Sequence, residues 1–472
     1  MGSGSDLWML LCNYWPVLLG NTLEWYEFAV YGYMESYMEK NFFRGSALAT
    51  WLGFTATFAA RPLGGMFLGI LSDTLGRKMA VIVSVIGMLS ATVGQGLLPT
   101  PRLWGNDSGM ADLGVGLLFF LRLVQGLCTG GEIGAVTTYI TEVSPRRSMG
   151  RCVTCISITA NAGFMLARLV VWAFQSHFGE GKMLDWAWRW PFILAIVPGL
   201  VSVWGRLFCL RESELFEEEH AHSEIENSDS DNELNEAVGR PKERKSTRRQ
   251  LMEFACTHLS AVMIGIGGVM SFAVFQYGGL VWMNSFLKKH GAPPDYLMLA
   301  GTCSRLLQMA LALPVGWLAD IYGTGLLMLA GAIAQTAAGL PFFMALSSDP
   351  GSVANLFASY TVASSLVASL QFTVYLYCAE LFPTAVRNLG VGVSYNIGFG
   401  IFGGFAPLFA EASLEWTPYG PGLMLSLAGL ITSVTILASV RCQRTGRVQL
   451  AHIRPRPYMG TWADGNGSMG AR

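Results

Sequence analysis

Long apolar runs separated by short polar breaks occupy most of this 472-residue chain, and they restrict its possible folds more than any other feature. A helix needs about 20 apolar residues to cross the roughly 30 Å hydrocarbon core of a bilayer. Dividing the chain at its polar and Gly/Pro-rich breaks gives twelve such stretches. They lie near 11–38, 47–71, 79–98, 112–142, 150–176, 187–209, 252–284, 295–319, 325–347, 352–380, 386–411 and 419–440. We therefore predict an all-α membrane protein with twelve transmembrane helices.

The composition agrees with a chain embedded in lipid. Charged residues make up 13% of it, whereas soluble domains carry about 25%. The net charge of −1 gives no reason to expect a nucleic-acid partner. Most of the nine cysteines lie inside apolar runs, and we interpret the C-x-x-C of Cys152 and Cys155 as two small buried residues rather than a redox pair.

One break differs from the others in length and charge. Residues 210–250 are acidic first and then basic, with almost no aromatic residues. Such a segment cannot bury a core, so we expect a disordered cytosolic linker. It divides the chain into an N-terminal six-helix bundle (1–209) and a C-terminal six-helix bundle (251–441), followed by a cytosolic tail (442–472).

The distribution of Lys and Arg predicts the orientation. Basic clusters occur at 73–78 and 144–151, at the end of the linker and in the tail. If these face the cytosol, as basic loops usually do, both termini are cytosolic. We expect a multi-pass protein of the plasma membrane, with an endomembrane as the alternative.

The two halves contain matching sequences in matching places. "GILSDTLGRK" (69–78) follows the second run and "GWLADIYGTG" (316–325) follows the eighth. "EVSPRRSMG" (142–150) follows the fourth and "ELFPTAVRNLG" (380–390) follows the tenth. Two matches in register indicate a duplication, and parallel repeats of this kind place a substrate near the midplane between the halves.

These residues resemble the major facilitator superfamily. G-x-L-x-D-x-x-G-R-K after the second run is similar to that superfamily's signature, and "RLVQG" (122–126) is similar to its second motif. More narrowly, "GNTLEWYEFAVYG" (20–32), "WRWPF" (188–192) and the run from 379 to 408 resemble the metabolite:proton symporter branch. That branch includes carriers of proline and betaine, shikimate, α-ketoglutarate and citrate. The resemblance implies the twelve-helix, two-bundle fold and proton-coupled transport.

The chain departs from that family pattern in three respects. Glu27 stands where the branch usually has aspartate, and the loop "DIYGTG" (320–325) lacks the expected basic residues. Arg168 and Arg305 are not expected from the pattern, so we regard them as possible marks of a different substrate.

Several charged residues lie inside the apolar runs. Glu24 and Glu27 lie about 13 to 16 residues from the cytosolic end of the first run, or roughly 20–24 Å along a helix. Arg122 lies at a similar central depth on the fourth run. Asn21, Glu24 and Glu27 follow i, i+3, i+6, which predicts one helix stripe. We predict that Glu24, Glu27 and Arg122 couple protons to transport, with a purely structural ion pair as the alternative for Arg122.

Other polar groups in the runs are candidate substrate ligands. An excess of central arginines over carboxylates favours a substrate that carries a carboxylate. The candidates are Arg61, Arg168, Arg305, Gln276, Tyr277, Gln371, Tyr375 and Asn396. Two alternatives stay open: Arg61, which precedes Pro62, could brace a kinked helix, and Arg168 could extend toward the interface.

The repeated loops and helix ends supply candidate gating residues. Glycines permit tight turns, and an acid at a helix start interacts with its free N–H groups. The candidates are Asp73, Gly76, Arg77, Lys78, Glu132, Glu142, Asp320, Glu380 and Arg387. They can serve as well-capped structural loops, as latches between the halves, or as both.

The predicted function is secondary active transport. The sequence has no phosphate-binding G-x-x-x-x-G-K-[ST] loop, no metal-ligand cluster and no nucleophile–base set. We therefore expect no enzyme activity and no cofactor, with protons as the coupling ion. We predict a monomer that carries a small organic anion, amino acid or betaine by proton symport. The alternatives are a facilitator or exchanger without proton coupling, and a non-transporting nutrient sensor.

Overall fold

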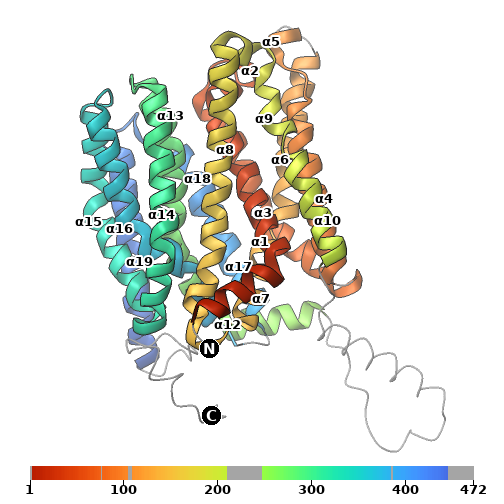
Figure 1. Ribbon diagram of the computed structural model, residues 1–472, viewed down its shortest axis with the longest axis vertical. Coiled ribbons are helices and arrows are strands. Elements are labelled where there is room, and N and C mark those ends of the chain that lie inside the picture. The colour runs from red at the N-terminus through yellow and green to blue at the C-terminus, as the bar shows by residue number, and fades with distance from the viewer. Residues whose placement is uncertain (1–2, 76, 105–108, 210–246, 384–385, 445–472) are drawn as a thin grey trace, which may run out of the picture.

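The computed structural model describes residues 3–75, 77–104, 109–209, 247–383 and 386–444. These residues are almost entirely helical, and no strand occurs among them (Figure 1). Because a helix satisfies its backbone hydrogen bonds internally, this is the architecture expected of segments that cross hydrocarbon. The all-α prediction is confirmed.

The helices form twelve spans in the predicted order. In the first half these are α1 (Ser3–Tyr33), α3 (Ala47–Leu75), α4 (Arg77–Gly96), α6 (Gly109–Thr129) with α7 (Glu132–Val143), α8 (Met149–Asp185), and α9 (Trp190–Ile193) with α10 (Ile196–Cys209). In the second half they are α12 (Thr247–Val274) with α13 (Met283–Lys289), α14 (Pro294–Tyr322), α15 (Thr324–Ser348), α16 (Val353–Glu380), α17 (Arg387–Gly398) with α18 (Gly404–Ser413), and α19 (Gly420–Arg444). Short helices α2 (Glu35–Phe42) and α5 (Pro101–Trp104) lie between spans.

Length and composition support these assignments. Within the described residues, nine helical segments are long and apolar enough to cross a membrane, and they correspond to the fourth through twelfth spans. The first three spans are α1, α3 and α4, which have 31, 29 and 20 residues.

Four spans consist of two separate helical parts. The fourth breaks at Gly130 and Gly131, and the sixth breaks between α9 and α10. In the seventh and eleventh, π-helical segments at Phe275–Trp282 and Phe399–Gly403 join the two α-helical parts. Such segments are rare and often lie at functional sites.

Helices pack mainly within each half of the chain. In the N-terminal half, α1 packs on α8, and α6 packs on α3 and α4; in the C-terminal half, α15 packs on α16 and α19. The halves meet through α8 against α14, α7 against α17 and α3 against α18. Figure 1 shows α13 to α16 and α19 on one side, α3, α4, α6 and α10 on the other, and α8 between them.

Most of the predicted linker and tail lies outside the described residues. The linker was predicted over 210–250, and α12 already begins at Thr247; the tail was predicted from 442, and α19 continues to Arg444. Residues 210–246 and 445–472 are not described.

Glycines bring α3 and α6 into close contact. A Cβ atom at Gly126 would lie 1.9 Å from the carbonyl oxygen of Thr57, and one at Gly130 would lie 2.0 Å from that of Arg61. Without side chains, the two backbones approach as small residues allow in membrane helices. This contact places Arg61 beside the break in the fourth span.

We predict that Gly126→Ala destabilises the protein, because the methyl group meets a backbone oxygen that cannot move aside. Overpacking of this kind costs about 1–3 kcal/mol. Gly116→Ala is the matched control, since a Cβ at Gly116 on the same helix meets nothing within 4 Å. Thermal unfolding of the two purified variants measures the difference, and equal stability would contradict the close packing.

Candidate functional site

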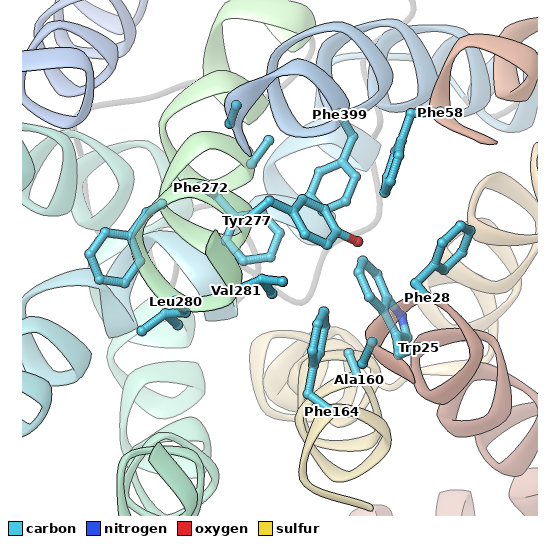
Figure 2. Close-up of a cluster of buried hydrophobic side chains, with 14 of the residues drawn as sticks. Trp25, Phe28, Phe58, Ala160, Phe164, Phe272, Tyr277, Leu280, Val281 and Phe399 are labelled. Carbon is cyan, nitrogen blue, oxygen red and sulfur yellow. The ribbon is translucent and has the colours of Figure 1, made fainter. Parts of the chain in front are cut away.

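Aromatic side chains fill the centre of the molecule where the two halves meet (Figure 2). Six rings form this central aromatic cluster: Trp25, Phe28, Phe58, Phe164, Tyr277 and Phe399. The Tyr277 ring centroid lies 5.0 Å from that of Phe58 and 5.4 Å from that of Phe399, so rings from opposite halves touch. Tyr277 and Phe399 belong to the two π-helical segments. The midplane is therefore closed by side chains from both halves.

Glu24 forms an ion pair with Arg61 beside this cluster. Its Oε1 accepts a hydrogen bond from Arg61 Nη2 at 3.0 Å, and both side chains are fully buried. Arg61 Nε donates to Asn396 Oδ1 at 3.2 Å. The Asn396 amide donates in turn to the carbonyls of Gly130 and Gly392. This chain of contacts joins α1 and α3 to α17 of the other half.

Glu27 has different surroundings, although it lies one turn further along α1. Its Oε2 accepts from the hydroxyl of Thr92 at 2.5 Å and from the amide of Gln125 at 3.4 Å. Its Oε1 has no hydrogen-bond partner, and the side chain is buried. Among the described residues, no cationic side chain forms an ion pair with it.

Arg122 forms no ion pair with any carboxylate that the structure describes, which differs from the structural ion pair considered for it as an alternative. Its guanidinium donates to the carbonyls of Gly53 and Phe54 at 3.2 and 3.1 Å, and it lies 4.1 Å from the Tyr31 ring centroid. It also donates to Gln125 Oε1 at 3.0 Å. Gln125 therefore connects Arg122 to Glu27.

The predicted stripe of Asn21, Glu24 and Glu27 spreads over three directions. Each step of three residues turns about 300° around a helix, which is about 60° short of a full turn. Asn21 consequently faces α8, where it donates to Ile156 O at 2.9 Å and Thr159 Oγ1 at 2.8 Å. Glu24 faces α3, and Glu27 faces α4 and α6.

A second buried ion pair joins Glu132 to Arg206, which the sequence analysis did not single out. Arg206 Nη2 donates to Glu132 Oε1, and both side chains are almost fully buried. Gly20 leaves room for this guanidinium, because a Cβ there would lie 1.7 Å from Arg206 Nη2. A lone arginine inside an apolar run was the signal that could have identified it.

Arg168 and Arg305 lie between the halves, further toward the α13 end of the bundle. Arg168 Nη1 donates to Leu297 O of α14 at 3.1 Å. Arg305 Nη1 donates to the side-chain oxygens of Asn161, Gln276 and Gln308 at 3.0, 3.2 and 3.2 Å. Both guanidiniums therefore contact neutral oxygens.

The remaining predicted ligands are buried in the C-terminal half. Tyr375 stacks on Tyr395, with hydroxyl oxygens 3.3 Å apart. The backbone carbonyl of Gln371 accepts from Ser157 at 2.9 Å, which brings α16 against α8. The Tyr277 hydroxyl has no hydrogen-bond partner in the part of the chain that the structure describes.

Contacts between the halves close the end at which α1 begins and α19 ends, here called the terminal end. Asp320 accepts from the backbone N–H of Gly150 at 2.6 Å and from Arg151 Nε at 2.8 Å. Glu142 Oε1 lies 3.7 Å from Arg387 Nη1. The acid of the second repeated loop thus interacts with the start of α8 in the first half, although its own loop lacks basic residues.

The other predicted gating residues of the repeated loops and helix ends are Glu380, Asp73, Gly76, Arg77 and Lys78. Glu380 accepts a hydrogen bond from Thr324 within the C-terminal half. Gly76 lies outside the described residues, as do the side chains of Asp73, Arg77 and Lys78.

Lysines to which the sequence analysis assigned no role close the opposite end. Lys289 Nζ lies 3.3 Å from Glu35 Oε1 and 2.9 Å from Glu39 Oε2. Lys288 lies 3.3 Å from Glu180. These pairs join α13 to α2 and α8, so acids of one half meet lysines of the other at this end.

Comparisons with known proteins agree with this architecture. The model of the "Sugar (and other) transporter" family matches residues 12–449. The chain belongs to this family. The predicted resemblance to the major facilitator superfamily is thereby confirmed, and the relatives are transporters rather than enzymes.

Two relatives and two solved structures illustrate the match. The chain is 30% identical over 433 residues to the ectoine/proline transporter of Corynebacterium glutamicum, covering 89% of this chain and 82% of the relative. It is 27% identical over 432 residues to the proline/betaine transporter of Escherichia coli, with 89% and 81% covered. The proton:xylose symporter bound to 6-bromo-6-deoxy-D-glucose superposes with a TM-score of 0.68 at 17% identity, covering 98% of this chain and 100% of that one. A partially occluded inward-open xylose transporter from E. coli gives 0.65 at 17% identity, with 92% and 97% covered. The structural likeness shows the fold and the family match shows the class, so this protein is a multi-pass membrane transporter of the major facilitator fold.

We predict that Arg61→Met lowers stability by about 3–5 kcal/mol, because it leaves the buried Glu24 carboxylate without its partner. The double variant Glu24→Gln/Arg61→Met should recover much of that loss. Thermal unfolding of both purified proteins tests this. A single variant no less stable than the double would show that the pair is not energetically coupled.

We predict that Asp320→Ala loosens the terminal end. Losing a charged hydrogen-bond partner should speed amide hydrogen exchange over residues 149–155 by about tenfold. The control is Glu39→Ala, which breaks a pair at the opposite end and should leave those amides unchanged. Equal effects of both variants on residues 149–155 would contradict separate closures.

Proposed function

We propose that this transporter is a proton-coupled symporter of a small carboxylate-bearing metabolite, working by alternating access. The observation that carries the proposal is the environment of Glu27. Its carboxyl group is buried, receives hydrogen bonds from the neutral groups of Thr92 and Gln125, and keeps one oxygen without a partner. Burying an unpaired carboxylate is far more costly than burying a carboxylic acid, so this position favours a bound proton when the centre is closed.

The surroundings of Glu27 also provide a way to release that proton. Gln125 bonds both Glu27 and Arg122, so a small shift of Gln125 changes how strongly the Arg122 charge acts on the carboxylate. Glu24 is already neutralised by Arg61, and that pair reaches Asn396 in the other half. We therefore assign proton carriage to Glu27, and to the Glu24–Arg61 pair the coupling of the halves.

The central aromatic cluster and the arginines next to it form the proposed substrate site. Rings from both halves meet there, and Arg305 lies 4.5 Å from the Phe164 ring centroid. Arginine binds carboxylates through paired hydrogen bonds. Two relatives are named as transporters of ectoine and proline and of proline and betaine. These names support a small amino-acid-like or carboxylate substrate.

The ion pairs at the two ends suit an alternating-access cycle. Arg151–Asp320 and Glu142–Arg387 would open for release at the terminal end, and the Lys289 and Lys288 pairs would open at the other. We further propose a monomer in the plasma membrane, with both termini in the cytosol and protons as the coupling ion in place of any cofactor.

We predict that Glu27→Gln abolishes proton-driven accumulation but spares some exchange, since glutamine holds the same hydrogen bonds and cannot release a proton. Proteoliposomes with an imposed pH gradient and an internal pH dye measure substrate uptake and proton entry together. Glu415→Gln, at an exposed carboxylate, is the control and should leave both signals intact.

Two results would contradict the proposal. Concentrative uptake that survives Glu27→Gln would remove the proton role of this residue. Uptake by the unaltered protein without any internal pH change would identify a facilitator or exchanger, and substrate binding without flux would identify a sensor.

A further inference from the structure

Four polar side chains from four spans meet on the α13 side of the central aromatic cluster. They are Tyr33 of α1, Arg168 of α8, Arg305 of α14 and Tyr360 of α16. All four are at least nine-tenths buried. Arg168 lies 4.8 Å from the Tyr33 ring centroid, and electrostatic interactions connect each tyrosine with both guanidiniums. We call this group the arginine–tyrosine cluster.

Each member has a polar atom that finds no hydrogen-bond partner among the described residues. These atoms are Arg168 Nε, Arg305 Nη2 and the hydroxyls of Tyr33 and Tyr360. All of them can donate hydrogen bonds. A buried donor left unsatisfied costs about 1–3 kcal/mol, and more when it is charged, so four together need an explanation.

The cluster also lacks a compensating negative charge. Over the described residues, no carboxylate forms an ion pair with Arg168 or Arg305, whereas Arg61 and Arg206 each have a glutamate. Among the described residues, the hydrogen bonds that Arg168 and Arg305 donate go to carbonyl and amide oxygens, and the tyrosine hydroxyls next to them are neutral as well. The positive charges of Arg168 and Arg305 are therefore buried together, and their described hydrogen-bond partners are neutral.

The backbone is shaped to hold one of these guanidiniums. A Cβ atom at Gly301 of α14 would lie 1.9 Å from Arg168 Nη1. The absence of a side chain there lets an arginine of the N-terminal half lie against a helix of the C-terminal half. The cluster therefore belongs to both halves, as a site that drives alternating access must.

We propose that the arginine–tyrosine cluster binds the carboxylate of the substrate and selects substrates of net negative charge over zwitterions. This inference rests on the proposed carboxylate transport and sharpens it. Four unpartnered donors lie in this one cluster, and an anionic substrate brings negative charge to its two guanidiniums. A zwitterion delivers its own cation beside two existing positive charges, which reduces the electrostatic gain. In this respect the chain differs from relatives named for proline and betaine, which are zwitterions.

Probes of matched size test this selectivity. We expect succinate and butyrate to stabilise the purified protein against heat, and 4-aminobutyrate and glycine betaine to do so less, at equal ionic strength. Calorimetric titration of the same compounds gives their affinities. Zwitterions that bind as tightly as the anions, or the absence of binding by both anions, would overturn the proposal.

Two kinds of variant locate the binding. Arg305→Gln removes one charge, and Gly301→Ala displaces the Arg168 guanidinium while keeping its charge. Each should weaken anion affinity by about tenfold or more, as expected for a lost charge-assisted hydrogen bond. Lys182→Gln, an exposed cation outside the cluster, is the control and should bind normally. A folded Gly301→Ala or Arg305→Gln protein with unaltered anion affinity would refute the assignment.

The results distinguish this inference from the broader proposal. Anion binding that depends on Arg305, without proton entry in proteoliposomes, would keep this site and remove proton symport. Proton-driven uptake of a zwitterion that does not depend on Arg168 or Arg305 would keep symport and remove this site.

Discussion

A charge in the middle of a bilayer needs an opposite charge or hydrogen-bonding groups around it, and this constraint explains how the centre of the transporter is arranged. Glu24 and Glu132 are each held by an arginine, Arg61 and Arg206. Glu27 instead receives hydrogen bonds from neutral donors. These three buried acids thus have different surroundings, and in the proposed mechanism Glu27 exchanges a proton while the other two hold helices together.

Hydropathy alone predicted the spans and the all-α class, because a helix that crosses lipid must be both long and apolar. The depth of a charged residue also follows from its position along the helix. Its partner does not, because pairing depends on how each helix is rotated about its axis. Glu24 and Arg61 both lie inside apolar runs and do pair, whereas Arg122, at a central depth similar to that of Glu24, bonds Gln125 and backbone carbonyls.

The residues that sequence reasoning missed show the same limit. Thr92 was not singled out and Gln125 was noted only as part of "RLVQG", and their contact with Glu27 gives them a role. The sequence assigned no role to Lys288 and Lys289, whereas in the structure their ion pairs join α13 to α8 and α2. The roles of these neutral hydrogen-bond donors and loop lysines depend on tertiary contacts, and the composition of a single segment does not predict such contacts.

The π-helical segments in the seventh and eleventh spans have a mechanical consequence. Each holds one surplus residue in the helical ladder. When the surplus residue shifts along the helix by one position, the neighbouring backbone hydrogen bonds break and re-form in turn. The side chain at the shifted position then rotates about the helix axis by about 100°. Tyr277 and Phe399 lie in these segments and close the midplane from the C-terminal half. A local rotation within these two π-helical segments can therefore move the Tyr277 and Phe399 rings out of the midplane while the rest of each bundle keeps its packing.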